Sequence, residues 1–261
     1  MNKLQKLYKI IGTGFTKDQY YESMNMALKR LDNEYTMLHY PLYVKDSDSF
    51  IQAQKNLTDF CISLLKPLKD KEILEIGCGN GVQALYINAS YGPSRITGID
   101  LDEANIAIAN SERDRAKLDN VFFLADDAQK LAHVPSDSAD VLLCIESAFH
   151  YPRKEAFLKE IHRVLKPGSY IVGIEPNVLN PLMGVYHTRR DHERNALFVN
   201  RFSLAHALEQ KFSRVYVESN NLAVSYNNAN YRKIINVINP LFTKAPFFKL
   251  FSLRYLFFAK K

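Results

Sequence analysis

Groups capable of acid–base chemistry close an apolar run at residues 144–152, CIESAFHYP. The run ends in the Glu146 carboxylate and the His150 imidazole, and a second carboxylate, Glu175, ends a later apolar run. A histidine, with an ordinary pKa of about 6.5, suits the deprotonation of a phenol or another hydroxyl. We predict that His150 is a general base and that Glu175 contacts the reacting molecule or orients the imidazole. The alternatives are a cap or wall residue for His150 and a solvated strand-end carboxylate for Glu175.

A glycine-rich loop, EIGCGNG at residues 75–81, follows a short apolar run and opens a helical stretch. Its three glycines let the backbone turn sharply and approach a ligand. Asp100 ends the next apolar run, where a carboxylate can accept hydrogen bonds from two ribose hydroxyls. A dinucleotide loop would read GxGxxG and bind a pyrophosphate. Here Glu75 precedes the glycines and the loop has no Lys or Arg, which favours a cationic ligand with an amino group and a sulfonium. The loop therefore indicates S-adenosylmethionine rather than NAD.

The elements that must position these groups alternate between strands and helices. Apolar runs predict strands over residues 72–77, 95–100, 120–126, 139–146, 169–176, 213–221 and 253–261. Helical spacing predicts helices over residues 49–68, 103–118, 154–168 and 201–212, with another from the glycine loop to residue 88. Pro167 and Gly168 are expected to end the helix over 154–168. The alternation predicts a parallel sheet covered on both faces, the doubly wound α/β class.

The chain is expected to divide into a helical N-terminal cap over residues 1–48 and a main domain over residues 49–261. Residues 1–45 are rich in tyrosine and in helix formers. Two stretches, about 177–200 and 227–251, interrupt the pattern and are predicted to be lid insertions. Doubly wound sheets bind ligands beyond the carboxyl ends of their strands. The glycine loop, Asp100, the 146–150 stretch and Glu175 are therefore expected to meet at one edge.

Composition limits the classes of function. The 261 residues carry a net charge of +6, and residues 228–261 hold seven basic and no acidic side chains. The remaining 27 basic and 28 acidic residues leave the body near neutrality, which argues against nucleic-acid binding. Three cysteines without a CxxC or His/Cys cluster predict neither disulfides nor a metal site. The sequence has no signal peptide and no run of about 18 apolar residues, so we expect a cytoplasmic protein.

At these motifs the chain resembles the class I S-adenosylmethionine-dependent methyltransferases. The resemblance runs from about residue 50 to residue 176 through EIGCGNG, GIDLD (98–102), FLADDAQKL (123–131), DSADVLLCIESAFHYP (137–152) and VLKPGSYIVGIEP (164–176). It implies a Rossmann-like, mostly parallel seven-stranded sheet. It also implies S-adenosylmethionine as cofactor, with S-adenosylhomocysteine as product.

The resemblance implies which residues hold the cofactor. Asp100 would bind the ribose, Leu101 would lie against the adenine, and Asp127 would accept the adenine amino group. Asp126 stands where the family usually has glycine, and the alternative for Asp127 is a turn or helix-cap aspartate. The full implied cofactor set is Glu75, Gly77, Cys78, Gly79, Asp100, Leu101, Asp127, Ala128 and Ile145.

The resemblance also bears on the reaction. Related small-molecule O-methyltransferases end the fourth strand with two histidines, of which His150 is the second and Phe149 replaces the first. Relatives that cyclopropanate fatty acids carry a glutamate immediately before this histidine, so Phe149 argues against that chemistry. The predicted catalytic residues are His150 and Glu175. The predicted acceptor contacts are Tyr40, Tyr43, Glu146, Phe149 and His187.

The predicted function is methyl transfer to a small aromatic or lipophilic acceptor, with oxygen favoured over carbon and nitrogen. Other hypotheses are a non-catalytic S-adenosylmethionine-binding partner protein and an RNA methyltransferase, the latter disfavoured by charge and by the lack of an NPPY-like motif. The basic, aromatic segment 227–251 is interpreted as a lid, or alternatively as a peripheral membrane contact. A monomer or a homodimer is expected.

Overall fold

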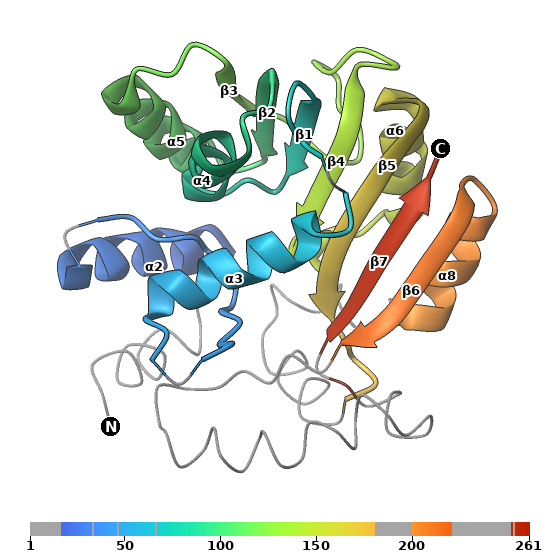
Figure 1. The fold of residues 1–261 in the computed structure, drawn as a ribbon, viewed down its shortest axis with the longest axis horizontal. Helices are drawn as coiled ribbons and strands as arrows, with labels where there is room; N and C mark the ends of the chain where they lie inside the picture. The colour runs from blue at the N-terminus through green and yellow to red at the C-terminus, as the bar shows by residue number, and fades with distance from the viewer. Residues whose placement is uncertain are drawn as a thin grey trace.

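The computed structural model describes residues 17–32, 34–45, 47–65, 67–180, 200–220, 252 and 254–261. Seven strands form one sheet in the order β3-β2-β1-β4-β5-β7-β6 (Figure 1). The strands are β1 (Glu72–Ile76), β2 (Arg95–Asp100), β3 (Val121–Ala125), β4 (Ala139–Ile145), β5 (Leu165–Pro176), β6 (Ser213–Asn220) and β7 (Arg254–Lys260). The predicted doubly wound sheet is confirmed.

Strands β1 to β5 pair in parallel, whereas β7 pairs antiparallel with both β5 and β6. The arrowheads of β4 and β5 therefore point opposite to that of β7 (Figure 1). The first residue of β7, Arg254, pairs with the last residue of β5, Pro176. The start of β7 thus lies at the edge where the parallel strands end.

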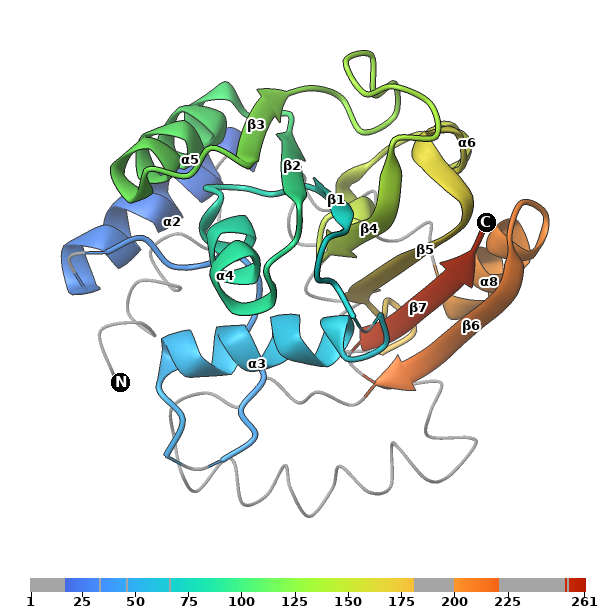
Figure 2. The ribbon, with the colours of Figure 1, turned by 45° about the horizontal axis from the view of Figure 1, so that its top comes forward.

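The helices cover both faces of the sheet. They are α2 (Lys17–Asp32), α3 (Phe50–Ile62), α4 (Val82–Tyr91), α5 (Glu103–Ala116), α6 (Lys154–Val164) and α8 (Arg201–Glu209), with a short 3₁₀ turn η1 (Ala148–His150). Helices α3, α4 and α5 share one core cluster with the sheet, and α6 and α8 share the other. The turned view separates α3 and α4 from α6 and α8 (Figure 2). None of the described helices is long and apolar enough to cross a membrane.

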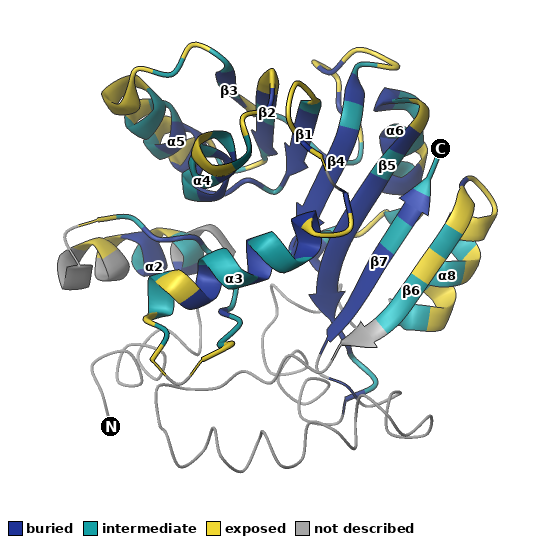
Figure 3. Ribbon diagram, in the orientation of Figure 1, coloured by how far each residue is buried: buried dark blue, intermediate teal, exposed yellow. Residues whose placement is uncertain are grey.

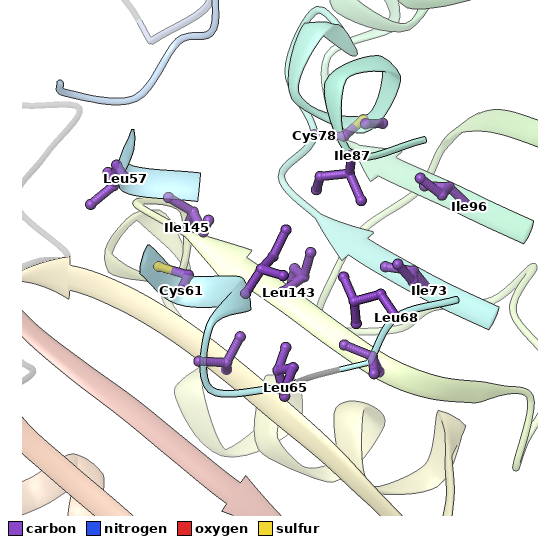
Figure 4. Close-up of a cluster of buried hydrophobic side chains, with 14 of the residues drawn as sticks. Leu57, Cys61, Leu65, Leu68, Ile73, Cys78, Ile87, Ile96, Leu143 and Ile145 are labelled. Atoms are coloured by element: carbon purple, nitrogen blue, oxygen red, sulfur yellow. The ribbon is translucent and has the colours of Figure 1, made fainter. Parts of the chain in front are cut away.

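Strand alternation explains the two cores. In β4, Leu143 and Ile145 pack with the α3 cluster, whereas Leu142 and Cys144 pack with the α6 cluster. This is the period of two that places successive side chains on opposite faces. Strands β4 and β5 are buried along most of their length (Figure 3). Figure 4 shows Leu143 and Ile145 in the cluster that also holds residues of α3.

The predicted helix over residues 154–168 is too long. Helix α6 ends at Val164, and β5 begins at Leu165. Pro167 disfavours a helical conformation in the residue before it. That residue, Lys166, instead reaches Glu72 and Asp140, with Nζ–O distances of 2.6 and 3.2 Å. At its start, the pairing of β4 with β5 contains a register shift, between Ala139 and Val141.

The other predicted elements agree closely with the structure, apart from the helix over 49–68, which ends at Ile62. Its start is fixed by the Ser49 side chain, which accepts a hydrogen bond from the Gln52 N–H. The predicted helical cap includes α2, and the division at residue 48 stays a prediction. The predicted insertions fall mainly outside the described residues, namely 181–199 and 221–250.

Candidate active site

A cleft opens at the carboxyl edge of β1, β2 and β4. The predicted residues Gly77, Cys78, Gly79, Asp100, Ile145, Glu146 and His150 line this cleft, together with Tyr21, Met37, Leu38, His39, Asn80, Gln83, Asp102, Asn105 and Ser147. The glycine loop, the end of β2 and the stretch after β4 therefore meet as predicted. The cap contributes the remaining wall.

The glycine loop requires glycine for two reasons. Gly77 and Gly81 both have positive φ angles, of 72° and 78°. A Cβ on Gly77 would stand 1.9 Å from the Ser147 Oγ, and one on Gly81 would stand 2.6 Å from the Ala109 Cβ. The loop is tied to β2, since the N–H groups of Gly77 and Cys78 both donate to the Ile99 carbonyl at 2.7 and 3.0 Å. Glycine at these two positions therefore avoids both collisions, and the hydrogen bonds to β2 fix the loop in place.

Asp100 is held by the loop that it faces. Its Oδ2 accepts from the Gly79 N–H at 2.9 Å, and its Oδ1 accepts from the Asp102 N–H at 2.9 Å. Each carboxylate oxygen can accept a further hydrogen bond. The carboxylate therefore has a fixed orientation and acceptor capacity for ribose hydroxyls, which fits its predicted role.

Glu75 is buried directly behind the loop, with 3% of its surface exposed. Burial, followed by the neighbouring charge of Asp100, raises the pKa of its carboxyl to about 8. Its Oε2 has no hydrogen-bond partner in the described part of the chain. A buried acceptor without a donor is costly. The ammonium group of the predicted cofactor is a chemically suitable partner.

Glu146 follows β4 with a positive φ of 51°, a strained conformation for a residue with a Cβ. Its Oε2 accepts from the Tyr40 N–H at 2.7 Å, and its Oε1 lies 2.6 Å from the Arg254 Nε. Both members of this ion pair are buried. Glu146 lines the cleft while it also joins the cap to β7.

The His150 imidazole contacts the hydroxyl of Tyr21, a residue of the cap. The Tyr21 hydroxyl lies 2.9 Å from the His150 Nε2, and both side chains line the cleft. The two rings meet edge to face with centroids 5.9 Å apart. His150 is therefore a wall residue of the cleft whose Nε2 is already matched to a hydroxyl oxygen.

Glu175 has a different place from the predicted one. Its oxygens accept hydrogen bonds from the backbone N–H groups of Ser147, Ala148 and Phe149 at 3.1, 2.8 and 3.1 Å. Burial raises the pKa of its carboxyl to about 7, against those N–H groups and the Lys154 charge. The side chain therefore fixes the turn that carries His150, and it neither orients the imidazole directly nor faces solvent.

Phe149 also departs from its predicted place at the acceptor. With Glu175 it lines a second, largely apolar pocket between the sheet and helices α6 and α8. Its ring packs 3.9 Å from the His150 ring, centroid to centroid. Phe149 thus packs against the imidazole and lines a pocket other than the cleft.

The predicted adenine contacts lie outside the residues that line the cleft. Asp127 Oδ1 accepts from the N–H and the side-chain amide of Gln129, both at 2.9 Å, which is the turn role that the sequence left open. Ala128 is buried in the α6 core, and Leu101 is 62% exposed. The adenine roles of these residues stay predictions.

Of the predicted acceptor tyrosines, Tyr40 does not line the cleft; its N–H donates to Glu146, which does, and its ring lies 5.5 Å from the Arg254 guanidinium. Tyr43 is half-buried and does not line the cleft. Tyr21, another cap tyrosine, takes the position that was expected of them. His187 lies outside the described residues.

Sequence reasoning missed a buried amide cluster that joins the cap to the site. The Asn80 side chain donates to the Asn25 Oδ1 and to the Thr36 carbonyl, both at 2.8 Å, and Asn25 donates to the Asn105 Oδ1 at 2.8 Å. Asn80 lies inside the glycine loop, and that position was the available signal. All three hydrogen bonds join residues that lie far apart in the chain.

Three comparisons with known proteins accord with this geometry. Residues 67–234 match a family model described as a methyltransferase domain. A segment of 105 residues is 38% identical to a fatty-acid O-methyltransferase of Mycolicibacterium smegmatis, covering 40% of this chain and 37% of that protein. A segment of 112 residues is 36% identical to a phthiotriol/phenolphthiotriol dimycocerosates methyltransferase of Mycobacterium tuberculosis, covering 42% and 40%. The chain thus spans about two fifths of these curated relatives.

Solved structures share the fold at low identity. The [4+2]-cyclase SpnF superposes with a TM-score of 0.67 at 18% identity, covering 95% of this chain and 97% of that one. Phosphoethanolamine N-methyltransferase 2 of Haemonchus contortus, solved in complex with S-adenosyl-L-methionine, gives 0.69 at 16% identity, covering 100% and 60%. At these identities the likeness concerns the fold alone.

Proposed function

Because the chain belongs to the methyltransferase domain family that its residues 67–234 match, we propose that it transfers a methyl group to an oxygen atom of a small lipophilic acceptor. The enzyme is an S-adenosylmethionine-dependent methyltransferase. The lipophilic acceptor is supported by the names of the two curated relatives, one of which is a fatty-acid O-methyltransferase. The observation that carries the choice of oxygen is the 2.9 Å contact between a hydroxyl, that of Tyr21, and the His150 Nε2.

The residues on the loop side of the cleft fit S-adenosylmethionine. The buried Glu75 carboxylate lacks a donor, and a ligand ammonium group would supply one. The fixed Asp100 carboxylate can accept from ribose hydroxyls. The glycines at 77, 79 and 81 have positive φ angles, which let the loop take the sharp turn that it makes beside the cleft. No Lys or Arg side chain lines the cleft among the described residues, as suits a positively charged ligand.

The bound cofactor supplies a methyl group on a positively charged sulfur. The chain must hold an acceptor in line with that methyl group and exclude water. An acceptor hydroxyl that takes the place of the Tyr21 hydroxyl would donate to the His150 Nε2. His150 would accept the proton of that hydroxyl as its oxygen takes up the methyl group supplied by the cofactor. General-base assistance of this kind contributes roughly 10²–10⁴-fold.

The surroundings of His150 support this role. The turn η1 is fixed from behind by three backbone hydrogen bonds to Glu175 and by the Phe149 ring. An imidazole held in this way loses little freedom when the acceptor binds. Glu175 is accordingly a positioning residue, and Tyr21 is the cap residue that gives way to the acceptor.

The test is turnover by the purified chain with S-adenosylmethionine and acceptors that share one alkyl chain: dodecanoate, dodecan-1-ol, a dodecylphenol and dodecylamine. We expect S-adenosylhomocysteine and a methylated product with at least one oxygen acceptor and none with the amine. Methylation of the amine alone would identify an N-methyltransferase. Binding of S-adenosylhomocysteine without turnover of any acceptor would favour the non-catalytic partner protein.

Two histidine variants sharpen the test. His150→Gln removes the base, whereas His206→Gln changes an exposed histidine on α8. We expect only His150→Gln to slow methylation of the phenol or the alcohol. Equal rates for the wild type and His150→Gln would contradict the assignment of His150 as the base.

A further inference from the structure

Arg254 is a buried charged group that the proposed reaction does not use. It is 2% exposed, at the first position of β7. Because β7 runs antiparallel to β5, this position lies at the edge of the sheet that carries the cleft. The sequence alone presents Arg254 as one of several basic residues near the end of the chain.

The Arg254 guanidinium is only partly satisfied. Its Nε lies 2.6 Å from the Glu146 Oε1, and the Tyr40 ring covers it at 5.5 Å. Its Nη1 and Nη2 are both buried and have no hydrogen-bond partner among the residues that the structure describes. A buried donor without a partner is unfavourable, and more so on a charged group. Two such donors on one planar guanidinium could together bind a ligand that carries hydrogen-bond acceptors.

The charges around Arg254 bear on which hydrogen-bond acceptor its two free N–H groups could bind. Burial lowers the pKa of His39 to about 4, so this imidazole is neutral near pH 7. Burial also raises the pKa of the Cys61 thiol to about 12, so the thiol is neutral as well. Glu146 is therefore the one anion beside Arg254 in the described part of the chain.

The geometry of the two unpartnered N–H donors of Arg254 indicates which ligand group they fit. Nη1 and Nη2 of one guanidinium present parallel N–H groups that match the two oxygens of a carboxylate. A phosphate monoester would bring close to two negative charges next to Glu146, whereas a carboxylate brings one. The positive sulfur of the cofactor, bound in the same cleft, would offset that single charge.

From these contacts we propose that Arg254 binds a carboxylate of the acceptor, so that the acceptor is a lipophilic carboxylic acid. The proposal rests on the proposed function, whose acceptor it specifies. Arg254 does not itself line the cleft, but its partner Glu146 does, so the carboxylate would approach Arg254 past the Glu146 side chain. Such a group is already deprotonated and needs no base, whereas a hydroxyl on the same acceptor would still need His150.

The test measures binding rather than turnover, so its failure is distinct from failure of the proposed function. The full chain, saturated with S-adenosylhomocysteine, is titrated with dodecanoate, dodecan-1-ol and dodecyl phosphate. We expect dodecanoate to bind tenfold or more tightly than the alcohol and more tightly than the phosphate. Equal affinity for acid and alcohol, or a preference for the phosphate, would overturn the proposal.

Variants assign the preference to Arg254. Arg254→Met with Glu146→Gln removes both buried charges together, since removing one alone would leave the other unpaired. The preference for acid over alcohol should fall to near one, while S-adenosylhomocysteine still binds. Lys260→Met, at the far end of β7, is the matched control and should keep the wild-type preference.

Arg254→Lys keeps a positive charge beside Glu146 and serves if the double variant does not fold. One ammonium group cannot offer two parallel donors. The preference for dodecanoate should therefore fall here too. An unchanged preference in either variant would show that Arg254 only neutralises Glu146.

Discussion

Replacement of Glu75 by glutamine is expected to stabilise the ligand-free enzyme and to weaken its binding of the cofactor. The carboxyl is buried, and its pKa in the folded chain is raised to about 8 from an ordinary value of 4.5. Between those two pH values the folded state holds a proton that the unfolded state has released. The free energy of unfolding of the wild type therefore falls as the pH rises through this window.

The magnitude follows from the two pKa values. At pH 7 the window has been crossed by about 2.5 units, which corresponds to roughly 3 kcal/mol at most. Glutamine has a similar size and does not titrate. The stability advantage of Glu75→Gln should therefore grow by up to that amount between pH 4.5 and pH 7 and level off above pH 8.

Although Glu75→Gln should stabilise the ligand-free enzyme, it should weaken the binding of the cofactor. An ionised Glu75 beside a ligand ammonium group forms a charge-assisted hydrogen bond worth about 1.5–3 kcal/mol, or roughly 10- to 100-fold in affinity. Urea unfolding at several pH values measures the stability difference, and calorimetric titration of S-adenosylhomocysteine measures the affinity. Glu72→Gln is the matched control, because Glu72 lies on the same strand but is partly exposed and paired with Lys166.

Two results would refute this reasoning. If the stability difference between Glu75→Gln and the wild type did not change with pH, the carboxyl would not be held protonated by burial. If the affinity for S-adenosylhomocysteine did not change, Glu75 would not face the amino group of the cofactor.

Other contacts in the cleft are tested by single changes. His150→Gln should lower kcat for a hydroxyl acceptor by roughly 10²–10⁴-fold, with S-adenosylhomocysteine affinity nearly unchanged by calorimetry; an equal loss of both would indicate a structural role. Asn80→Ala breaks two hydrogen bonds between the glycine loop and the cap, one of them to Asn25, at a cost of about 1–3 kcal/mol. Limited proteolysis between α2 and α3 should become faster, and an unchanged rate would contradict the link. Gly77→Ala places a Cβ 1.9 Å from the Ser147 Oγ at positive φ, so urea unfolding should show a loss of about 2–5 kcal/mol. Adding Ser147→Gly should recover the part due to the collision, and no recovery would place the whole cost in the backbone.

The fold could be predicted from the sequence because its signals are local. Each strand is a short apolar run, and most helices have caps and apolar spacing that neighbouring residues determine. The helix over 154–168 was overextended because the competing partners of Lys166, namely Glu72 and Asp140, lie far away in the chain.

The candidate site was only partly predictable, for the same reason. The glycine loop and Asp100 come together through the local strand–loop–helix pattern. The place of Glu175 at the end of a strand predicts a catalytic carboxylate, but its three backbone donors come from a turn some 26 to 28 positions earlier. Arg254 meets Glu146, a residue of the cleft wall, only because β7 is antiparallel, which no local pattern indicates.

The central claim is that the enzyme places a methyl group on oxygen. The most direct measurement uses S-adenosylmethionine labelled with ¹³C in its methyl group, together with the acceptor that gives the fastest turnover. The carbon chemical shift of the labelled product distinguishes O-, N- and C-methyl groups. We predict an O-methyl resonance that depends on the wild-type enzyme. An N-methyl or C-methyl resonance would contradict the account.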